Sequence, residues 1–163
     1  MAFAVSLLFD SDVAEAVSAC CRRLAAAGIS RSMLDLDYKP HATLAVYDEL
    51  DVAAAVACLD RAFGGVDQIR VALTGFSTFG ANSGVCYAAL APSPELIALQ
   101  AAITGVIGGS CRPHYQPEGW TPHCTLAVAM EGAAMERARD LLEPDWRALA
   151  CSRRPIWSSL SPS

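Results

Sequence analysis

A seven-residue segment that occurs twice constrains this chain more than any other feature of its sequence. Residues 40–46 read Pro-His-Ala-Thr-Leu-Ala-Val, and residues 122–128 repeat six of these seven positions, with cysteine in place of the first alanine. The two copies contain two of the three histidines in the chain. Core packing requires apolar residues, but not a histidine and a threonine at matching positions. The repetition therefore predicts two matching polar half-sites.

Each copy is short and rich in apolar and β-branched residues, which favours a β-strand. Side chains alternate along a strand, so His41 and Thr43 should project from one face and their neighbours from the other. His123 and Thr125 take the same positions in the second copy. We therefore expect two strands whose polar faces meet one ligand. A repeat kept only for packing would instead bury both histidines against apolar neighbours.

The order of the expected elements also repeats along the chain. Strands are expected at 3–9, 41–47, 69–74, 85–90, 123–129 and 146–151. Four helices are expected: from a cap at Ser11 or Asp12 to about 27, at 52–63, from about 94 to 107, and a last one that ends near 142. The motif histidines are 82 residues apart (123 − 41). This repeat of two predicts a single α+β domain, 1–163, with two lobes related by a pseudo-two-fold axis about a central cleft.

The two expected halves are joined at a glycine-containing hinge. Residues 75–83 would link the first half, about 1–78, to the second, about 79–152. Polar connections at 29–39 and 110–121 lead into the two motif strands. The tail, 153–163, follows the last expected strand, and we expect it to be partly disordered.

Composition and charge exclude several classes of protein. The chain has 163 residues, 53% of them hydrophobic and 18% charged, which is typical of a folded domain with a full core and not of a disordered chain. The net charge of −5 argues against an extended nucleic-acid surface, although a local cleft could still bind a nucleotide or an RNA end. The most apolar helical run, 96–107, is too short to span a membrane.

Cysteine usage and the N-terminus indicate the compartment. Seven cysteines form no C-x-x-C pair, and an odd number cannot all pair in disulfides. The first nine residues lack the basic region of a signal peptide and are typical of a buried strand. We expect a cytoplasmic protein in a reducing environment, without a membrane partner and monomeric.

Two histidines combined with two threonines suit displacement at phosphorus. One imidazole can take a proton from water while the other protonates the leaving oxygen. The hydroxyls of Thr43 and Thr125 can donate hydrogen bonds to the non-bridging phosphoryl oxygens. A strained cyclic phosphodiester is the easiest substrate for such a set, and no metal or other cofactor is required.

A zinc site and a cysteine nucleophile are the chemical alternatives. Neither motif histidine has a metal-ligand residue two or four positions further along, and Asp48 and Glu131 lie where turn or cap residues are expected. Cys124 is part of the second motif but would point away from His123 on a strand. Both alternatives are therefore weaker than acid–base catalysis by two histidines.

Two P-H-x-T-L segments, 82 residues apart in a chain of this size, resemble the 2H phosphoesterase superfamily. The resemblance covers nearly the whole chain. It implies a bilobal α+β fold of two small antiparallel sheets flanked by helices, and hydrolysis of 2′,3′-cyclic or 2′-5′-linked phosphodiesters of nucleotides or RNA ends. It also implies that His123 activates water while His41 protonates the leaving oxygen. The alternative is a non-catalytic nucleotide-binding module of the same fold, which would not need both histidines.

Side chains in the connections could contact a base or a terminal phosphate by stacking or by charge. The candidates are Tyr38, Lys39, Arg112, Tyr115 and Trp120, with Phe79 as an apolar wall of the cleft. His114 has no counterpart in the first half and is expected on the surface near the entrance. Ordinary packing or solvent exposure is the alternative role for each of these side chains.

Overall fold

The structure is a computed structural model that describes residues 2–63, 69–79, 83–151 and 156–162. These residues form five α-helices, one short 3-10 helix and seven β-strands. In chain order they are β1 (Phe3–Phe9), α1 (Ser11–Ala26), α2 (Ser32–Leu36), β2 (His41–Tyr47), α3 (Val52–Phe63), β3 (Ile69–Val71), β4 (Leu73–Thr78), β5 (Cys86–Leu90), α4 (Pro94–Ile107), the 3-10 helix η1 (Pro113–Tyr115), β6 (His123–Ala127), α5 (Gly132–Cys151) and β7 (Ile156–Pro162).

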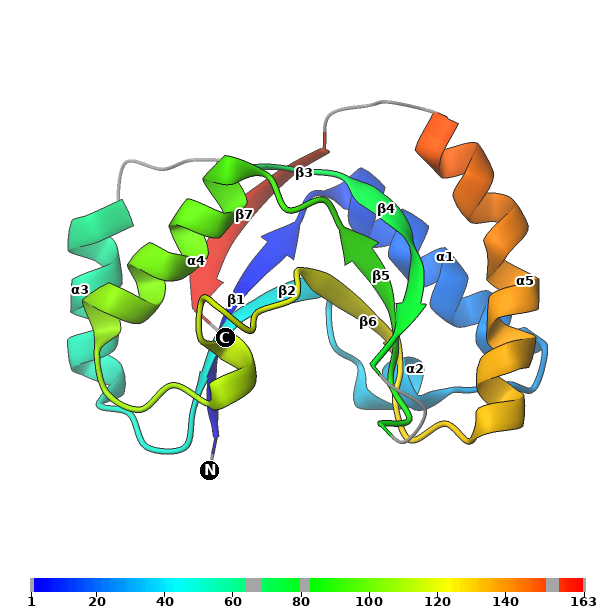
Figure 1. The fold of residues 1–163 in the computed structure, drawn as a ribbon, viewed down its shortest axis with the longest axis horizontal. Coiled ribbons are helices and arrows are strands. Elements are labelled where there is room, and N and C mark those ends of the chain that lie inside the picture. Colours follow the sequence, from blue (N-terminus) through cyan, green and yellow to red (C-terminus); the bar gives the residue numbers. More distant parts are fainter. Residues whose placement is uncertain (1, 64–68, 80–82, 152–155, 163) are drawn as a thin grey trace.

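The strands form two small antiparallel sheets, with strand orders β2-β1-β7-β3 and β4-β5-β6. The expected α+β class with two small antiparallel sheets is therefore confirmed. The motif strands β2 and β6 are each the last strand of their sheet, and they lie next to one another at the centre of the molecule (Figure 1). A bridge between Tyr47 and Cys111, and a hydrogen bond of 2.8 Å from Arg112 N to Val46 O, join the end of β2 to the connection before β6.

Two of the helices pack against the sheet that does not contain the strand before them. Helix α1 follows β1, yet it packs beside β6 and α5. Helix α4 follows β5, yet it contacts β2 and β3 of the other sheet. Figure 1 shows α3 and α4 beside one sheet and α1 and α5 beside the other. Each sheet is thus contacted by a helix that follows a strand of the other sheet. This exchange helps to hold β2 against β6.

The start of α1 follows from its first residues, although the cap lies one or two positions earlier than expected. Asp10 has extended backbone, and its carboxylate accepts a hydrogen bond from Val13 N at 3.0 Å, so Asp10 is the N-cap instead of Ser11 or Asp12. The buried residues of the helix recur at helical spacing: Val13, Val17, Cys20, Cys21 and Leu24. The helix ends before Gly28, whose φ of 62° suits glycine.

The prediction of a strand at 146–151 is wrong, because α5 continues to Cys151. The helix continues through Pro144, although a proline inside a helix removes one backbone hydrogen bond. Burial explains the continuation: Trp146 is 5% exposed and lies on the same buried helical face as the residues one, two and three turns earlier. The members of that face are Met135, Ala138, Leu142 and Trp146.

The hinge and the tail also differ from the expectation. Strand β4 extends to Thr78 and pairs with β5, so the first part of 75–83 is a regular strand of the second sheet, while 80–82 lie outside the described residues. In the tail, 156–162 pair as β7 with both β1 and β3 in the first sheet. A strand in that position supplies hydrogen-bond partners to two neighbours that would otherwise be open edges. Residues 153–155 and 163 lie outside the described residues.

Among the described helices, none combines the length and the apolar character that a membrane span requires. Six cysteines within the described residues are free thiols: Cys20, Cys21, Cys58, Cys86, Cys111 and Cys124. Burial is the main cause that raises the pKa of the Cys124 thiol to about 12. A thiol with such a pKa is protonated at neutral pH, which makes Cys124 a poor nucleophile.

Candidate active site

The two repeated segments form β2 and β6, and both alternate as the sequence predicts. His41 and Thr43 on β2, and His123 and Thr125 on β6, are half-buried. The alternate positions are at most 1% exposed: Ala42, Leu44, Cys124 and Leu126. One face of each strand therefore packs in the core, and the other carries a histidine and a threonine.

Both histidine rings are held in the same way by the chain that precedes them. Nδ1 of His41 lies 2.7 Å from the carbonyl oxygen of Lys39, and Nδ1 of His123 lies 2.7 Å from that of Thr121. A carbonyl oxygen can only accept, so Nδ1 carries the hydrogen and donates it in both rings. Nε2 of the neutral ring can then accept a proton, and Nε2 of the protonated ring can donate one.

The motifs are close enough to act on each other. The indole Nε1 of Trp120 donates to the carbonyl oxygen of Thr43 at 3.0 Å, and the backbone N–H of His41 lies beside the Cys124 thiol. Burial is the main cause of a lowered pKa at His123, and the like charge of His41 lowers that pKa further. The two imidazoles are therefore within electrostatic reach. Their expected arrangement, face to face across a cleft with room for one phosphate, stays a prediction.

His123 belongs to an aromatic cluster. Its ring centroid lies 4.8 Å from that of Phe79 and 5.3 Å from that of Tyr87, and those two rings are 4.3 Å apart. Burial lowers the pKa of His123 below the ordinary value of 6.5, against the smaller upward effect of its hydrogen bond to the Thr121 carbonyl. The aromatic neighbour of His41 is Tyr38, whose ring is 6.3 Å away and which is 61% exposed. The two histidines thus occupy unequal environments.

The neighbouring strands add two hydroxyl-bearing residues that the sequence did not reveal. Ser6 on β1 pairs with Thr43, and Tyr87 on β5 pairs with Thr125. Directly paired residues share one face of a sheet, with Cβ atoms about 4.5–5.5 Å apart. Ser6 and Tyr87 are 5% and 7% exposed. Each motif threonine therefore has a second hydroxyl-bearing residue beside it, and strand register is the signal that identifies them.

Three of the predicted substrate-binding residues lie beside a motif histidine. Tyr38 and Lys39 are exposed in the segment that enters β2, and the backbone of Lys39 holds the ring of His41. Phe79 follows β4 and contacts the ring of His123. Their contacts with a substrate stay predictions.

The other three predicted substrate-binding residues lie in the connection before β6, where the structure shows them in contact with other parts of the protein. The exposed guanidinium of Arg112 pairs with the carboxylate of Asp48, with 3.0 Å between Nε and Oδ1. Tyr115 is half-buried against the core, and Trp120 is 7% exposed. A buried indole cannot present its face to a base, so the burial of Trp120 favours packing over stacking. His114 is exposed on η1, as expected.

Replacing Trp120 with phenylalanine should lower the free energy of unfolding by about 1–3 kcal/mol, because the Thr43 carbonyl loses a buried donor. Urea denaturation measures this change. Trp146→Phe is the matched control, since the buried indole nitrogen of Trp146 has no hydrogen-bond partner within the described residues. Trp146→Phe should lower the free energy of unfolding by less than Trp120→Phe does. A raised KM with unchanged stability in Trp120→Phe would instead support stacking on a base.

Within the part of the chain that the structure describes, no three His, Cys, Asp or Glu side chains are grouped so that they could hold a metal ion. The candidate site combines two imidazoles, whose ring contacts with backbone carbonyls are made by Nδ1, with the hydroxyl-bearing side chains around them.

Two antiparallel sheets that each carry an H-x-T strand, with the two strands side by side, define a protein of the two-histidine phosphoesterase class. Residues 34–154 match the 2′-5′ RNA ligase superfamily, and the chain belongs to this superfamily. The matched range contains both motifs, so the resemblance to the 2H phosphoesterases is confirmed. Membership in a superfamily of phosphoesterases suggests an enzyme. No curated protein sequence matches the chain closely enough to serve as a relative.

Proposed function

We propose that the protein is a metal-independent phosphoesterase that hydrolyses 2′,3′-cyclic or 2′-5′-linked phosphodiesters of nucleotides or RNA ends. The observation that carries the proposal is the shared geometry of the two histidines. Each donates from Nδ1 to a backbone carbonyl, which leaves Nε2 for proton transfer. A pair of such imidazoles supplies both the base and the acid that hydrolysis requires. The free thiols of the described cysteines support a reducing compartment such as the cytoplasm.

In the proposed reaction, Nε2 of His123 takes a proton from a water molecule as the water oxygen bonds to phosphorus. The bond from phosphorus to one ribose oxygen breaks, and Nε2 of protonated His41 gives its proton to that oxygen. The product is a phosphomonoester with a free ribose hydroxyl. The unequal environments support this assignment, because burial lowers the pKa of His123 and keeps it neutral, as a base must be.

The hydroxyl groups of the site suit the charge of the phosphoryl group. Thr43 and Thr125 can each donate to a non-bridging oxygen, whose charge persists throughout displacement at phosphorus. Ser6 and Tyr87 lie on the same faces by strand pairing and can add donors. These four hydroxyl groups would hold the phosphoryl group between the two Nε2 atoms.

The test is an assay with a panel of 2′,3′-cyclic mononucleotides, ADP-ribose cyclic phosphate and 2′-5′-linked dinucleotides. Phosphomonoester formation, followed by chromatography or by ³¹P NMR, is the expected result for at least one of them. Tight binding of a cyclic nucleotide without turnover would replace the proposal by a nucleotide-binding module. If the protein neither binds nor hydrolyses any member of the panel, the proposed site is rejected.

The pH dependence of kcat/KM should be bell-shaped, because one imidazole must be neutral and the other protonated. The acidic limb should lie below 6.5, since burial lowers the pKa of His123 from that value. Phe79→Ala should expose the His123 ring and raise its pKa, which moves the acidic limb to higher pH.

Phe76→Ala is the matched control for Phe79→Ala. Phe76 is also half-buried and lies on β4, but its partner Ala88 pairs in turn with Cys124, on the face away from His123. This control should leave the acidic limb in place. If the acidic limb does not move in Phe79→Ala, the aromatic cluster does not determine the pKa of His123.

A further inference from the structure

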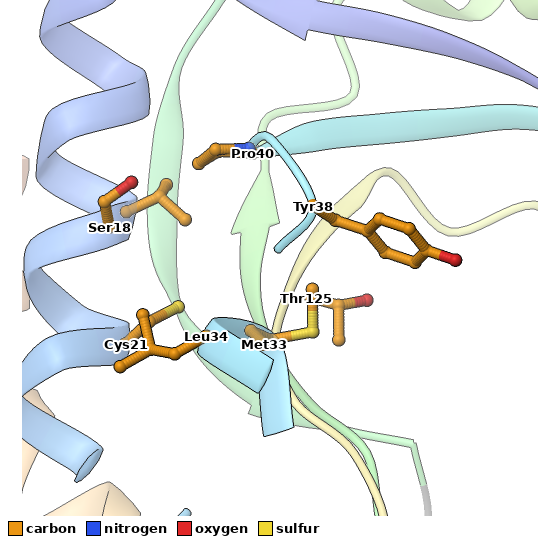
Figure 2. Close-up of a pocket in the computed structure, with 8 residues that line it drawn as sticks. Ser18, Cys21, Met33, Leu34, Tyr38, Pro40 and Thr125 are labelled. Atoms are coloured by element: carbon orange, nitrogen blue, oxygen red, sulfur yellow. The ribbon is translucent and has the colours of Figure 1, made fainter. Parts of the chain in front are cut away.

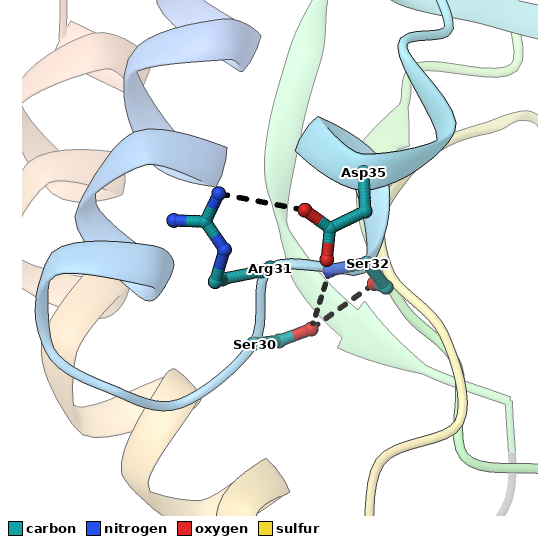
Figure 3. Close-up of polar contacts among 4 residues, drawn as sticks. All are labelled: Ser30, Arg31, Ser32 and Asp35. Atoms are coloured by element: carbon teal, nitrogen blue, oxygen red, sulfur yellow. Dashed lines mark hydrogen bonds and ion pairs between the residues drawn. The ribbon is translucent and has the colours of Figure 1, made fainter.

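The segment before β2 is held by polar contacts. Figure 3 shows the Ser30 hydroxyl accepting from Ser32 N at 3.3 Å and lying 3.0 Å from the Ser32 hydroxyl, with Arg31 paired to Asp35 at 3.4 Å. The Ser32 hydroxyl also accepts from Val128 N at 3.0 Å, just past the end of β6. Helix α2 is therefore tied to the second motif strand, although none of its own residues is buried.

This tethered segment presents apolar side chains to solvent. Leu34, Leu36 and Tyr38 are 37%, 45% and 61% exposed. They are three of the six exposed large hydrophobic residues in the described part of the chain, gathered within residues 34–38. The hydrogen bonds of Ser32 and the packing of half-buried Met33 against the core hold α2 in place, whereas these three side chains remain largely in solvent. Exposed apolar side chains gathered next to a polar site are typical of a ligand-binding surface.

A pocket of about 40 Å³ opens between this segment, α1 and β6 (Figure 2). Its lining contains no charged side chain: Val17, Ser18, Cys21, Met33, Leu34, Tyr38, Pro40 and Thr125. Figure 2 shows Thr125 beside Met33 and below Tyr38. The pocket shares Thr125 with the proposed active site, and its lining includes Pro40, which directly precedes His41.

We infer that this pocket and the apolar side chains of 34–38 form the subsite for the uncharged aromatic ring of the substrate, a nucleobase beside the scissile phosphate. The inference rests on the proposed function. A phosphate group would find no counter-charge in this lining, whereas desolvating an uncharged ring costs far less than desolvating a charged phosphate. Met33 offers an adaptable thioether and Tyr38 an exposed ring face, both suited to a planar partner.

The dimensions support the edge-on entry of one ring. A single water needs roughly 10–15 Å³ of such space, so about 40 Å³ admits a few waters or the edge of a ring, not a complete nucleobase. The rest of the ring would lie against Tyr38, whose own ring is 6.3 Å from that of His41. The phosphate attached through the ribose would then lie toward Thr125 and the histidines.

The test compares adenosine 2′,3′-cyclic phosphate with ribose 2′,3′-cyclic phosphate, which lacks the base. Tyr38→Ala should raise KM for the adenosine compound on the order of 10-fold or more, as expected for the loss of one base–aromatic stack, and should affect the base-free compound far less. Tyr38→Phe keeps the ring and should keep KM near the wild-type value. Ile97→Ala, on α4, is the control, because Ile97 is 38% exposed and does not line the pocket.

An equal effect of Tyr38→Ala on both compounds, or no effect on either, would overturn the inference. If the wild-type protein hydrolyses neither of these two compounds nor any other member of the panel above, the proposed function fails. Binding of adenosine 2′-monophosphate, measured by calorimetry, then decides the subsite alone: affinity lost in Tyr38→Ala but kept in Tyr38→Phe supports it, and equal affinity in all three proteins rejects it.

Discussion

His41→Ala and His123→Ala should each lower kcat for a 2′,3′-cyclic nucleotide by at least about 100-fold, because a positioned acid or base typically contributes 10²- to 10⁴-fold. The double variant should lose less than the product of the two single losses, since residues that act as a unit are not additive. Initial rates at saturating substrate measure these losses. Thr43→Ala and Thr125→Ala should each have a smaller effect, because each removes one of several hydroxyl donors.

His114→Ala is the control, since it removes the exposed histidine of η1 and should leave kcat unchanged. Denaturant unfolding of the same variants separates catalysis from packing. If the repeat served packing alone, removing either motif histidine would lower stability and leave turnover per folded molecule intact. Activity that survives the loss of either histidine would place the chemistry elsewhere.

The motif strands could be predicted because their signal is local. Alternation of side chains follows from strand geometry at each residue, so His41 and Thr43 had to share a face once the segment was a strand. Superfamily membership followed from the same few residues. The contact of each Nδ1 with the carbonyl two residues earlier is equally local, but it depends on side-chain rotamers that the residue types do not specify.

The hydroxyl-bearing neighbours could not be predicted, because they depend on pairing between segments far apart in the chain. A shift of one residue in register would turn Ser6 or Tyr87 to the opposite face. Both strand pairs also contain an irregularity, between Val5 and Ser6 and between Cys86 and Tyr87. Counting along the sequence does not locate such irregularities.

Packing across the sheets decides the features that local sequence signals do not determine. Pro144 is a local stop signal, but the burial of Trp146 on the face of α5 that packs beside β4 outweighs it. The burial of Trp120 has a similar origin, because the ring reaches β2 of the first sheet, which only the folded arrangement brings near. The sequence alone therefore does not tell whether an aromatic residue in a loop packs in the core or contacts a ligand, because the answer depends on how the sheets are arranged.

A substrate whose leaving group departs without a proton should rescue one histidine variant and not the other. In the 4-nitrophenyl ester of a nucleoside 3′-phosphate, the phenolate leaves unaided, so the general acid becomes dispensable. We expect His41→Ala to hydrolyse this ester at close to the wild-type rate. His123→Ala should remain at least about 100-fold slower, because the attacking water still needs its base.

This difference follows from the surroundings of the two rings and not from their motifs, which are nearly identical. The ring of His123 lies against Phe79 and Tyr87, and burial lowers its pKa, so it enters the reaction neutral. The pH profile of the rescued His41→Ala should accordingly keep its acidic limb and lose its alkaline limb, since His123 alone must then be in the correct state. Rescue of His123→Ala in place of His41→Ala would reverse the two roles, and loss of wild-type activity in EDTA would show that a metal, and not the imidazole pair alone, carries the reaction.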